Sequence, residues 1–313
     1  MATRATIALL SVLLFTACTA IPRPPAVVGM PRDDRSARLS AVWIGHATVL
    51  LRLGDQRVLT DPNLNGILYI VPRDTEASVR AKEIPFAQAI LVSHMHFDHF
   101  DRPTLRALSP NSALFHPVGG EPYAGSLTQH RREALSPWQQ TRAGDLTITA
   151  VPVQHFGGRY GLDALWNDAY TGYVIDGGGM RVFFAGDTGY SPTIFREIGE
   201  RFPGIDLALI PIAPYRGDKG NRVHVNPREA LQIFRDVGAR YMIPIHYEAY
   251  YASWTGYDRP RSDLEAAVRE AGVEGRVFAL RPGERWSLPR KESDKPEITR
   301  ELRRPPPSRT AVR

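Results

Sequence analysis

Directly after the short apolar run Ala89–Val92, three histidines and an aspartate fall within six residues: His94-Met95-His96-Phe97-Asp98-His99. A short apolar run of this kind is typical of a buried β-strand. Because side chains alternate along an extended segment, His94 and His96 are expected to point the same way and to bind one ion together. Asp98 and His99 follow where the chain turns, so they can reach a second ion. Imidazole and carboxylate groups suit zinc and similar divalent metals, so the cluster predicts a metal site at a strand end.

Three more ligand-type residues follow apolar runs that predict strands. His155 comes after the run 146–151, Asp187 after 181–185 and His246 after 241–245. Strand ends are where functional side chains are usually mounted on a rigid sheet. One buried histidine after a strand has a structural role more often than a catalytic one. The recurrence at three strand ends favours one site shared with the cluster at 94–99.

The pattern of apolar runs predicts the fold class. Strands are expected at 41–44, 49–53, 57–60, 89–92, 146–151, 171–175, 181–185, 207–210, 241–245 and 276–279, and helices at 103–108, 191–201, 226–238 and 263–271. Strands dominate first and then alternate with helices, so we predict an α+β fold in which two sheets pack together with helices outside them. Because the ligand-type residues come from both halves, residues 40–289 are expected to form one catalytic domain.

The chain of 313 residues has a single cysteine, Cys18. One cysteine excludes an intramolecular disulfide. It also leaves only nitrogen and oxygen ligands for a metal site in the folded domain.

Residues 1–17 predict a secretory signal peptide. Arg4 supplies a positive charge, and Ile7–Phe15 is an apolar run too short to span a bilayer as a helix. Ala17 and Cys18 resemble the cleavage site of bacterial lipoproteins, in which the cysteine is lipidated and becomes the mature N-terminus. We therefore expect an exported membrane lipoprotein that faces the periplasm, with residues 18–39 as a lipid-anchored tether. The alternatives are an ordinary cleaved signal peptide with a chance cysteine, or an uncleaved anchor.

The positive charge is concentrated at the C-terminus. Residues 290–313 carry eight basic and four acidic side chains, which accounts for four of the six net positive charges. The remaining chain is close to neutral, so no nucleic-acid partner is expected. The segment also contains Pro305-Pro306-Pro307 and few apolar residues, which predicts a disordered basic tail.

The six-residue cluster resembles the His-X-His-X-Asp-His signature of the metallo-β-lactamase superfamily, and the later His, Asp and His come in that superfamily's order. The resemblance spans residues 40–288 and implies a four-layer αββα sandwich that binds one or two metal ions. It implies three ligands for the first ion (His94, His96, His155), three for the second (Asp98, His99, His246), and Asp187 as the bridge between them. Two divalent ions are therefore expected; zinc is the default, and iron or manganese suit the same ligands.

Further segments resemble the N-acyl phosphatidylethanolamine-hydrolysing phospholipase D group: Trp43-Ile44-Gly45-His46-Ala47-Thr48, Gln154-His155-Phe156 with Arg159, and His224-Val225-Asn226-Pro227. The resemblance implies a phosphodiesterase that acts on a phospholipid or another phosphodiester near a membrane. Two metal ions lower the pKa of bound water to about 7, so a metal-bridging hydroxide is the expected nucleophile.

Individual roles follow from this interpretation. Asp98 is expected to orient the hydroxide as well as to bind metal, and His224 to donate to a substrate phosphate or leaving group. Arg159 is expected to pair with a phosphate, because guanidinium suits that geometry. His46, in a tight turn, is expected to be packed and hydrogen-bonded. Two alternatives stay open: a lactonase or other acyl hydrolase with the same metals, and a non-catalytic metal-binding surface lipoprotein.

Overall fold

The computed structural model describes residues 29–68, 71–160, 162–216, 220–250, 259–289 and 295–299. The predicted signal peptide, Cys18 and most of the predicted basic tail lie outside these ranges. Within them, no helix has both the length and the apolar character needed to cross a membrane.

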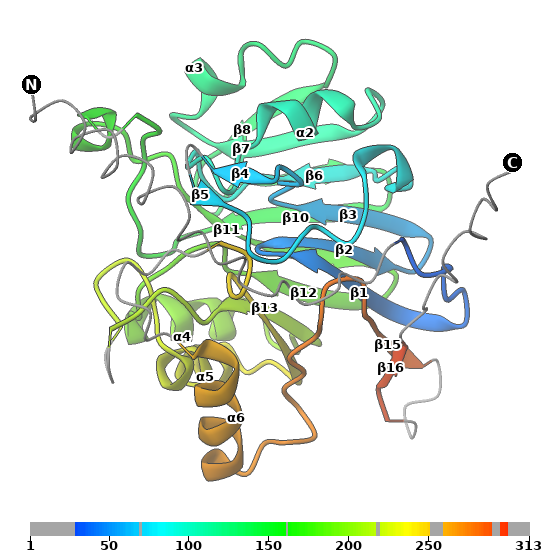
Figure 1. The fold of residues 1–313 in the computed structure, drawn as a ribbon, viewed down its shortest axis with the longest axis vertical. Coiled ribbons are helices and arrows are strands. Elements are labelled where there is room, and N and C mark those ends of the chain that lie inside the picture. Colours follow the sequence, from blue (N-terminus) through cyan, green and yellow to red (C-terminus); the bar gives the residue numbers. More distant parts are fainter. Residues whose placement is uncertain are drawn as a thin grey trace, which may run out of the picture.

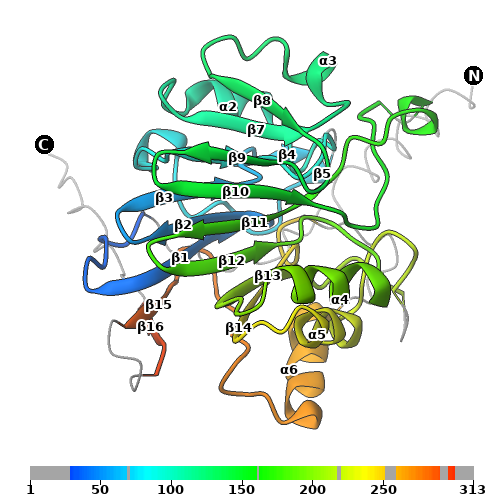
Figure 2. The same cartoon turned by 180° about the vertical axis from the view of Figure 1, so that it is seen from behind.

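The described strands form two large sheets that lie face to face, the first in front in Figure 1 and the second in front in Figure 2. The first has the order β16-β15-β1-β2-β3-β6-β7-β8. Its strands are β1 (Ala37–Gly45), β2 (Thr48–Leu53), β3 (Gln56–Thr60), β6 (Ala89–Leu91), β7 (Ala113–Pro117), β8 (Arg132–Leu135), β15 (Arg285–Pro289) and β16 (Glu297–Thr299). A separate short hairpin pairs β4 (Ile67–Leu68) with β5 (Val71–Pro72).

The second sheet has the order β14-β13-β12-β11-β10-β9. Its strands are β9 (Gln140–Ala143), β10 (Leu146–Val151), β11 (Gly172–Gly177), β12 (Met180–Phe184), β13 (Leu207–Pro211) and β14 (Tyr241–Ile245). Strands β10, β11 and β12 are antiparallel in turn, while β12, β13 and β14 are parallel. The carboxyl ends of β10, β12 and β14 therefore lie along the same edge.

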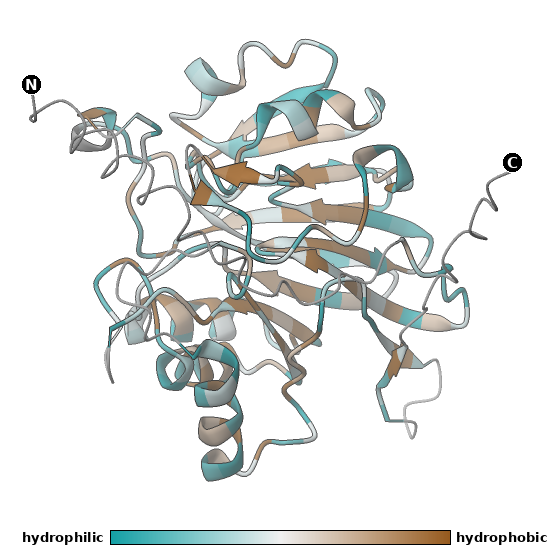
Figure 3. Cartoon of the chain, viewed as in Figure 1, coloured by the Kyte–Doolittle hydropathy of each residue, from teal (hydrophilic) through white to brown (hydrophobic). Residues whose placement is uncertain are grey.

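Alternating side chains explain why the first sheet is buried on both faces. In β1, Ala41 and Trp43 belong to the core shared with the second sheet, whereas Val42 and Ile44 belong to a separate core on the outer face. In Figure 3 the strands of both sheets carry much of the brown, hydrophobic colour.

Helices close the two outer faces. They are α2 (Arg102–Ala107), α3 (Glu121–Ala124), α4 (Pro192–Arg201), α5 (Pro227–Asp236) and α6 (Pro260–Ala271), with short 3-10 turns η1 (Ala81–Glu83) and η2 (Leu162–Leu165). Leu105 of α2 packs in the outer core of the first sheet, and Phe195 of α4 and Phe234 of α5 pack in the large core around the second sheet. The layers are thus helix, sheet, sheet and helix, which confirms the predicted αββα sandwich.

The structure differs from the expected boundaries at both ends. β1 begins at Ala37, and the Gly29 amide donates to the Ser78 carbonyl at 2.8 Å, so the described fold begins before residue 40. Within the predicted disordered tail, Glu297–Thr299 pairs with β15 as strand β16, because β15 would otherwise be a bare sheet edge. The strand expected at 276–279 is reduced to one bridge from Val277 to Met242.

Phe184 lies at the end of β12 and is fully buried, whereas Phe86 lies on a loop and is 43% exposed. Replacing Phe184 with Ala is expected to lower the free energy of unfolding by about 3–5 kcal/mol, because it removes buried apolar surface and leaves a cavity. The matched change Phe86→Ala should cost less than about 1 kcal/mol. Urea denaturation of the two variants measures both values; equal losses would contradict the described packing.

Candidate metal centre

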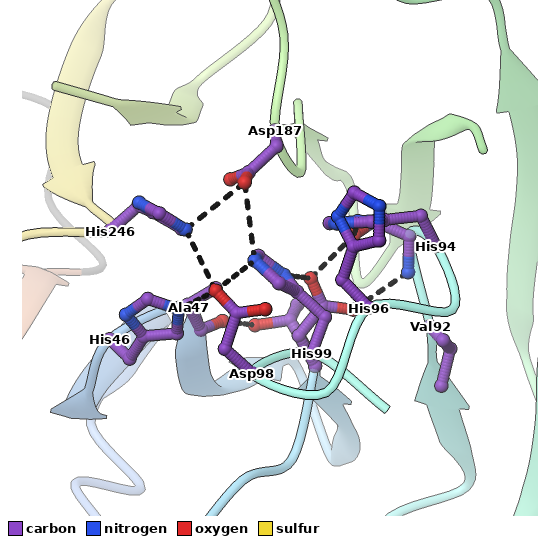
Figure 4. A network of polar contacts seen from close by, with 12 residues as sticks. His46, Ala47, Val92, His94, His96, Asp98, His99, Asp187 and His246 are labelled. Carbon is purple, nitrogen blue, oxygen red and sulfur yellow. Dashed lines mark hydrogen bonds and ion pairs between the residues drawn. The ribbon is translucent and has the colours of Figure 1, made fainter. Parts of the chain in front are cut away.

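One edge of the sandwich collects the predicted ligand residues, and Figure 4 labels all of them except His155. His94 and the rest of the motif follow β6, while His155, Asp187 and His246 follow β10, β12 and β14. Because the carboxyl ends of these three strands share an edge, residues far apart in sequence converge there. The structure therefore brings together all seven residues that the sequence predicted as ligands.

The first donor set consists of His94, His96 and His155, each of which offers a ring nitrogen within 4.8 Å of the others. The ring nitrogens on the far side are held by the protein: His94 Nδ1 lies 2.9 Å from Ser93 Oγ, and His155 Nδ1 donates to the Val223 carbonyl at 2.9 Å. His94 Nε2 is buried and has no hydrogen-bond partner among the described residues. A polar atom left this way is costly, so this donor set fits a metal ion.

The second donor set consists of His46, Asp98, His99 and His246, again within 4.8 Å of one another. Asp98 Oδ2 lies 3.0 Å from His46 Nε2, 3.3 Å from His246 Nε2 and 3.4 Å from His99 Nε2. His46 was expected only to pack and to hydrogen-bond. Its bond to Asp98 places it directly at the centre. The sequence signal was the Gly45-His46 pair, which is typical of a tight turn. In the structure His46 has a positive φ of 57° in this turn.

Asp187, which the resemblance implies as the bridging ligand, faces the second set. Its Oδ2 lies 3.0 Å from His246 Nε2 and 3.3 Å from His99 Nε2, as Figure 4 shows. Its Oδ1 is buried and has no hydrogen-bond partner among the described residues. The two sets are adjacent, because the rings of His94 and His99 are 4.1 Å apart between centroids. One oxygen of Asp187 is therefore engaged, and the other is available to a cation.

Asp61 is a supporting residue that the sequence reasoning missed. Its Oδ2 accepts from His99 Nδ1 at 2.6 Å and from Ser93 Oγ at 2.6 Å, and its Oδ1 accepts from the Ser93 amide at 2.7 Å. It is fully buried. A carboxylate behind a ligating imidazole fixes its tautomer and orientation. The available signal was position, because Asp61 directly follows the strand predicted at 57–60.

The electrostatics differ between the two donor sets. Burial lowers the pKa of His155 to about 3 and holds the pKa of His94 well below its usual range. Burial acts in the same direction on His246, but Asp187 and the hydrogen bonds to Asp187 and Asp98 outweigh it and raise the pKa of His246 to about 9. The first set is therefore neutral at pH 7, whereas the second holds at least one proton.

Arg159 has a different environment from the one expected of a phosphate ligand. Its side chain is 8% exposed, and its NH1 donates to the carbonyls of Met95 and Phe100, each at 2.8 Å. The guanidinium also lies over the Phe97 ring, 3.8 Å from the centroid. Through these contacts Arg159 stabilises the loop that carries the metal motif. The guanidinium group has several N–H donors, which can bind backbone carbonyls as well as phosphate.

His224 lies at the centre, as expected, on the loop before α5. Its Nδ1 is 3.6 Å from Asp187 Oδ2, and its ring is 5.2 Å from the His155 ring. A capping box between Asn226 and Glu229 fixes the start of α5 just after it, since each side chain accepts from the other's amide. Burial lowers the pKa of His224 to about 4, so it is neutral at pH 7.

Comparison with known proteins gives the family. The family model described as a beta-lactamase superfamily domain matches residues 56–247, so the chain belongs to this superfamily. An N-acyl-phosphatidylethanolamine-hydrolyzing phospholipase D of Caenorhabditis elegans is 30% identical over 270 residues, which cover 79% of this chain and 75% of that protein. A UPF0173 metal-dependent hydrolase of Thermus thermophilus is 31% identical over 249 residues, 77% of this chain and 96% of that one.

Among solved structures, a metallo-beta-lactamase fold protein of Bacillus subtilis matches with a TM-score of 0.58 at 19% identity, covering 79% of this chain and 98% of that chain. At this identity the match bears on the fold alone. The chain is a metal-dependent hydrolase of the metallo-β-lactamase superfamily, and the resemblance to the phospholipase D group is confirmed.

Asp61 offers a test of the support behind the donor sets. Asp61→Asn keeps the shape of the side chain but weakens the hold on His99, and it is expected to lower zinc affinity by about 10–100-fold. Asp55→Asn is the matched control, since the Asp55 side chain is 97% exposed in a turn. Competition with a chromophoric chelator measures both affinities. Equal affinities for the two variants would show that Asp61 does not support a metal site.

Proton release on metal binding distinguishes the two donor sets. His246 has a pKa raised to about 9, so it must lose a proton to bind zinc at pH 7.5, and zinc affinity of its set should fall as pH falls. His155 has a pKa lowered to about 3 and has no proton to lose. Calorimetry of chelator-treated protein in buffers of different ionisation enthalpy counts the protons. His246→Ala should reduce the count and His155→Ala should not; the reverse order would contradict this assignment.

Proposed function

We propose that this chain is a di-metal phosphodiesterase of phospholipase D type, acting on N-acyl phosphatidylethanolamine-like lipids. The observation that carries the proposal is the pair of adjacent donor sets, with the Asp187 carboxylate against His99 and His246 of the second set. Phosphodiester hydrolysis suits such a pair, because the attacking and leaving oxygens can each be stabilised from its own side. The relative named as an N-acyl-phosphatidylethanolamine-hydrolyzing phospholipase D supports the substrate class.

The donor atoms fit two divalent ions, and zinc suits a set made only of imidazole and carboxylate groups. One ion would be held by His94, His96 and His155. The other would be held by His99 and His246 together with either His46 or Asp98, and Asp187 would be shared. His94 Nε2 and Asp187 Oδ1 are both buried without a hydrogen-bond partner among the described residues. Once bound, the ions would supply a water-derived nucleophile at neutral pH and polarise the phosphoryl oxygen.

The chain's own residues position the reaction. Neighbouring imidazoles outweigh burial and hold the pKa of Asp98 well below its usual range, so its carboxylate stays charged. The Asp98 side chain is 20% exposed, so it can accept a hydrogen bond from the attacking water and orient it. His224 is neutral at pH 7 and its side chain is 16% exposed. It can donate one N–H to a phosphate oxygen or to the leaving oxygen.

We also propose that the protein is exported and held at the bacterial membrane, facing the periplasm, through a lipid on Cys18. The support is the composition of residues 1–17, with Arg4 followed by the short apolar run Ile7–Phe15. A membrane location would also bring the centre to a phospholipid substrate. Cys18 lies outside the described residues. Acyl labelling of the expressed chain, compared with Cys18→Ser, tests the attachment.

Activity assays test the substrate. Purified zinc-loaded protein is expected to cleave N-acyl phosphatidylethanolamine in mixed micelles to phosphatidic acid and an N-acylethanolamine, and to hydrolyse a generic phosphodiester. His96→Ala and Asp187→Ala should each lower the rate by about 10³-fold or more and reduce bound metal, because they remove ligands of the polarising ions. Asp55→Asn, far more exposed, is the control and should keep both.

Two results would contradict the proposal. Turnover of a lactone panel without any phosphodiester would favour the acyl hydrolase alternative. Less than one ion per chain by metal analysis, together with no turnover, would favour a non-catalytic surface protein.

A further inference from the structure

The segment Phe156–Trp166 exposes an unusual amount of apolar surface. Four of its side chains are large, hydrophobic and exposed: Phe156 at 39%, Tyr160 at 60%, Leu162 at 75% and Trp166 at 72%. The described residues show eight such side chains in total, so half of them fall within eleven residues. Apolar surface gathered in this way marks an interaction site more often than chance exposure does.

The same segment turns its charged side chains inward. Arg159 and Asp163 are its two charged residues, and they are 8% and 9% exposed. Asp163 Oδ2 accepts from the Arg159 amide at 2.8 Å and from the Tyr123 hydroxyl at 2.6 Å, and its Oδ1 accepts from the Tyr160 amide at 2.7 Å. These bonds hold the segment in a conformation in which its charged side chains are buried and its large hydrophobic side chains are exposed.

Two of the apolar side chains, Phe156 and Tyr160, border the metal centre. The Phe156 ring lies 4.5 Å from the His96 ring and 4.8 Å from the His155 ring, and the Tyr160 ring lies 5.8 Å from that of Phe97. A surface in contact with the apolar segment would therefore lie next to the donor sets.

The start of the domain lies along the same edge. The Gly29 amide is bound to the Ser78 carbonyl, and the Ser78 amide donates to the carbonyl of Ile44, two residues before His46. Ten residues lie between Cys18 and Gly29, so the two Cα atoms are at most about 36 Å apart along a fully extended chain. A lipid on Cys18 would thus allow this edge to lie close to a bilayer.

We propose that Phe156, Tyr160, Leu162 and Trp166 form a bilayer-docking surface that inserts into the headgroup and upper acyl region beside the metal centre. The partner is a lipid surface because the segment presents hydrophobic and aromatic groups and no exposed charge, which suits the boundary between headgroups and hydrocarbon. The inference rests on the proposed function, since it gives a phospholipid substrate a short path from the bilayer to the donor sets.

The test uses the full chain carrying Cys18→Ser, so that no attached lipid contributes. With phosphatidylcholine–phosphatidylethanolamine vesicles whose acyl chains are brominated, tryptophan fluorescence should be quenched, and Trp166→Phe should abolish most of the quenching. In vesicle flotation, Leu162→Ser is expected to weaken partitioning by about ten-fold, because a side chain of that size loses its burial in lipid. Phe86→Ser is the matched control and should change partitioning by less than two-fold.

Unchanged quenching in Trp166→Phe would overturn the inference, and so would equal weakening of vesicle partitioning by Leu162→Ser and Phe86→Ser. A dimer in light scattering that Leu162→Ser dissociates would also overturn it, because the surface would then bind a second copy of the chain. Binding is measured without turnover. A chain that docks on vesicles but hydrolyses no phosphodiester would overturn the proposed function and uphold the surface.

Discussion

The structure depends on two carboxylates, Asp98 and Asp187, that lie among imidazoles at one edge of the sandwich. Moving a carboxylate out of water is expensive unless positive charge and hydrogen bonds compensate it. His99 and His246 supply part of that compensation, and for this reason the pKa of each is raised although burial alone would lower it. Divalent cations can take the place of these protons. The same arrangement therefore explains both the stability of the buried charges and the affinity for metal.

The two sheets meet at this edge through the backbone as well as through side chains. The His246 amide donates to the His46 carbonyl at 3.1 Å, and the Trp43 Nε1 donates to the same carbonyl at 2.8 Å. The Trp43 ring stacks on Tyr247 at 4.5 Å between centroids. The turn after β1 and the end of β14 are thereby locked together. Ligands contributed by different sheets consequently keep one geometry, as a metal centre requires.

Much of the fold and the convergence of the seven candidate ligands could be predicted from the sequence, because apolar runs mark buried strands and these residues follow the strands. Asp61 and His46 show what local patterns miss, since the value of each depends on a partner 38 and 52 residues away, His99 and Asp98 respectively. Arg159 was expected to face a phosphate. Its actual partners are backbone carbonyls. Because every residue has one, the sequence cannot indicate such a contact. Strands β7, β8, β9 and β15 were not predicted. β8 and β9 carry mostly polar side chains that are exposed or partly exposed, so no apolar run marks them.

The docking surface proposed beside the centre would suit a substrate that is polar at one end and lies in a lipid surface. We propose that this edge holds two adjacent ions that share Asp187. Anomalous diffraction from crystals grown with zinc, recorded on both sides of the zinc absorption edge, tests it most directly. Two peaks are predicted, one within His94, His96 and His155 and one beside Asp98, His99 and His246. A single peak, or zinc bound away from these residues, would contradict the account.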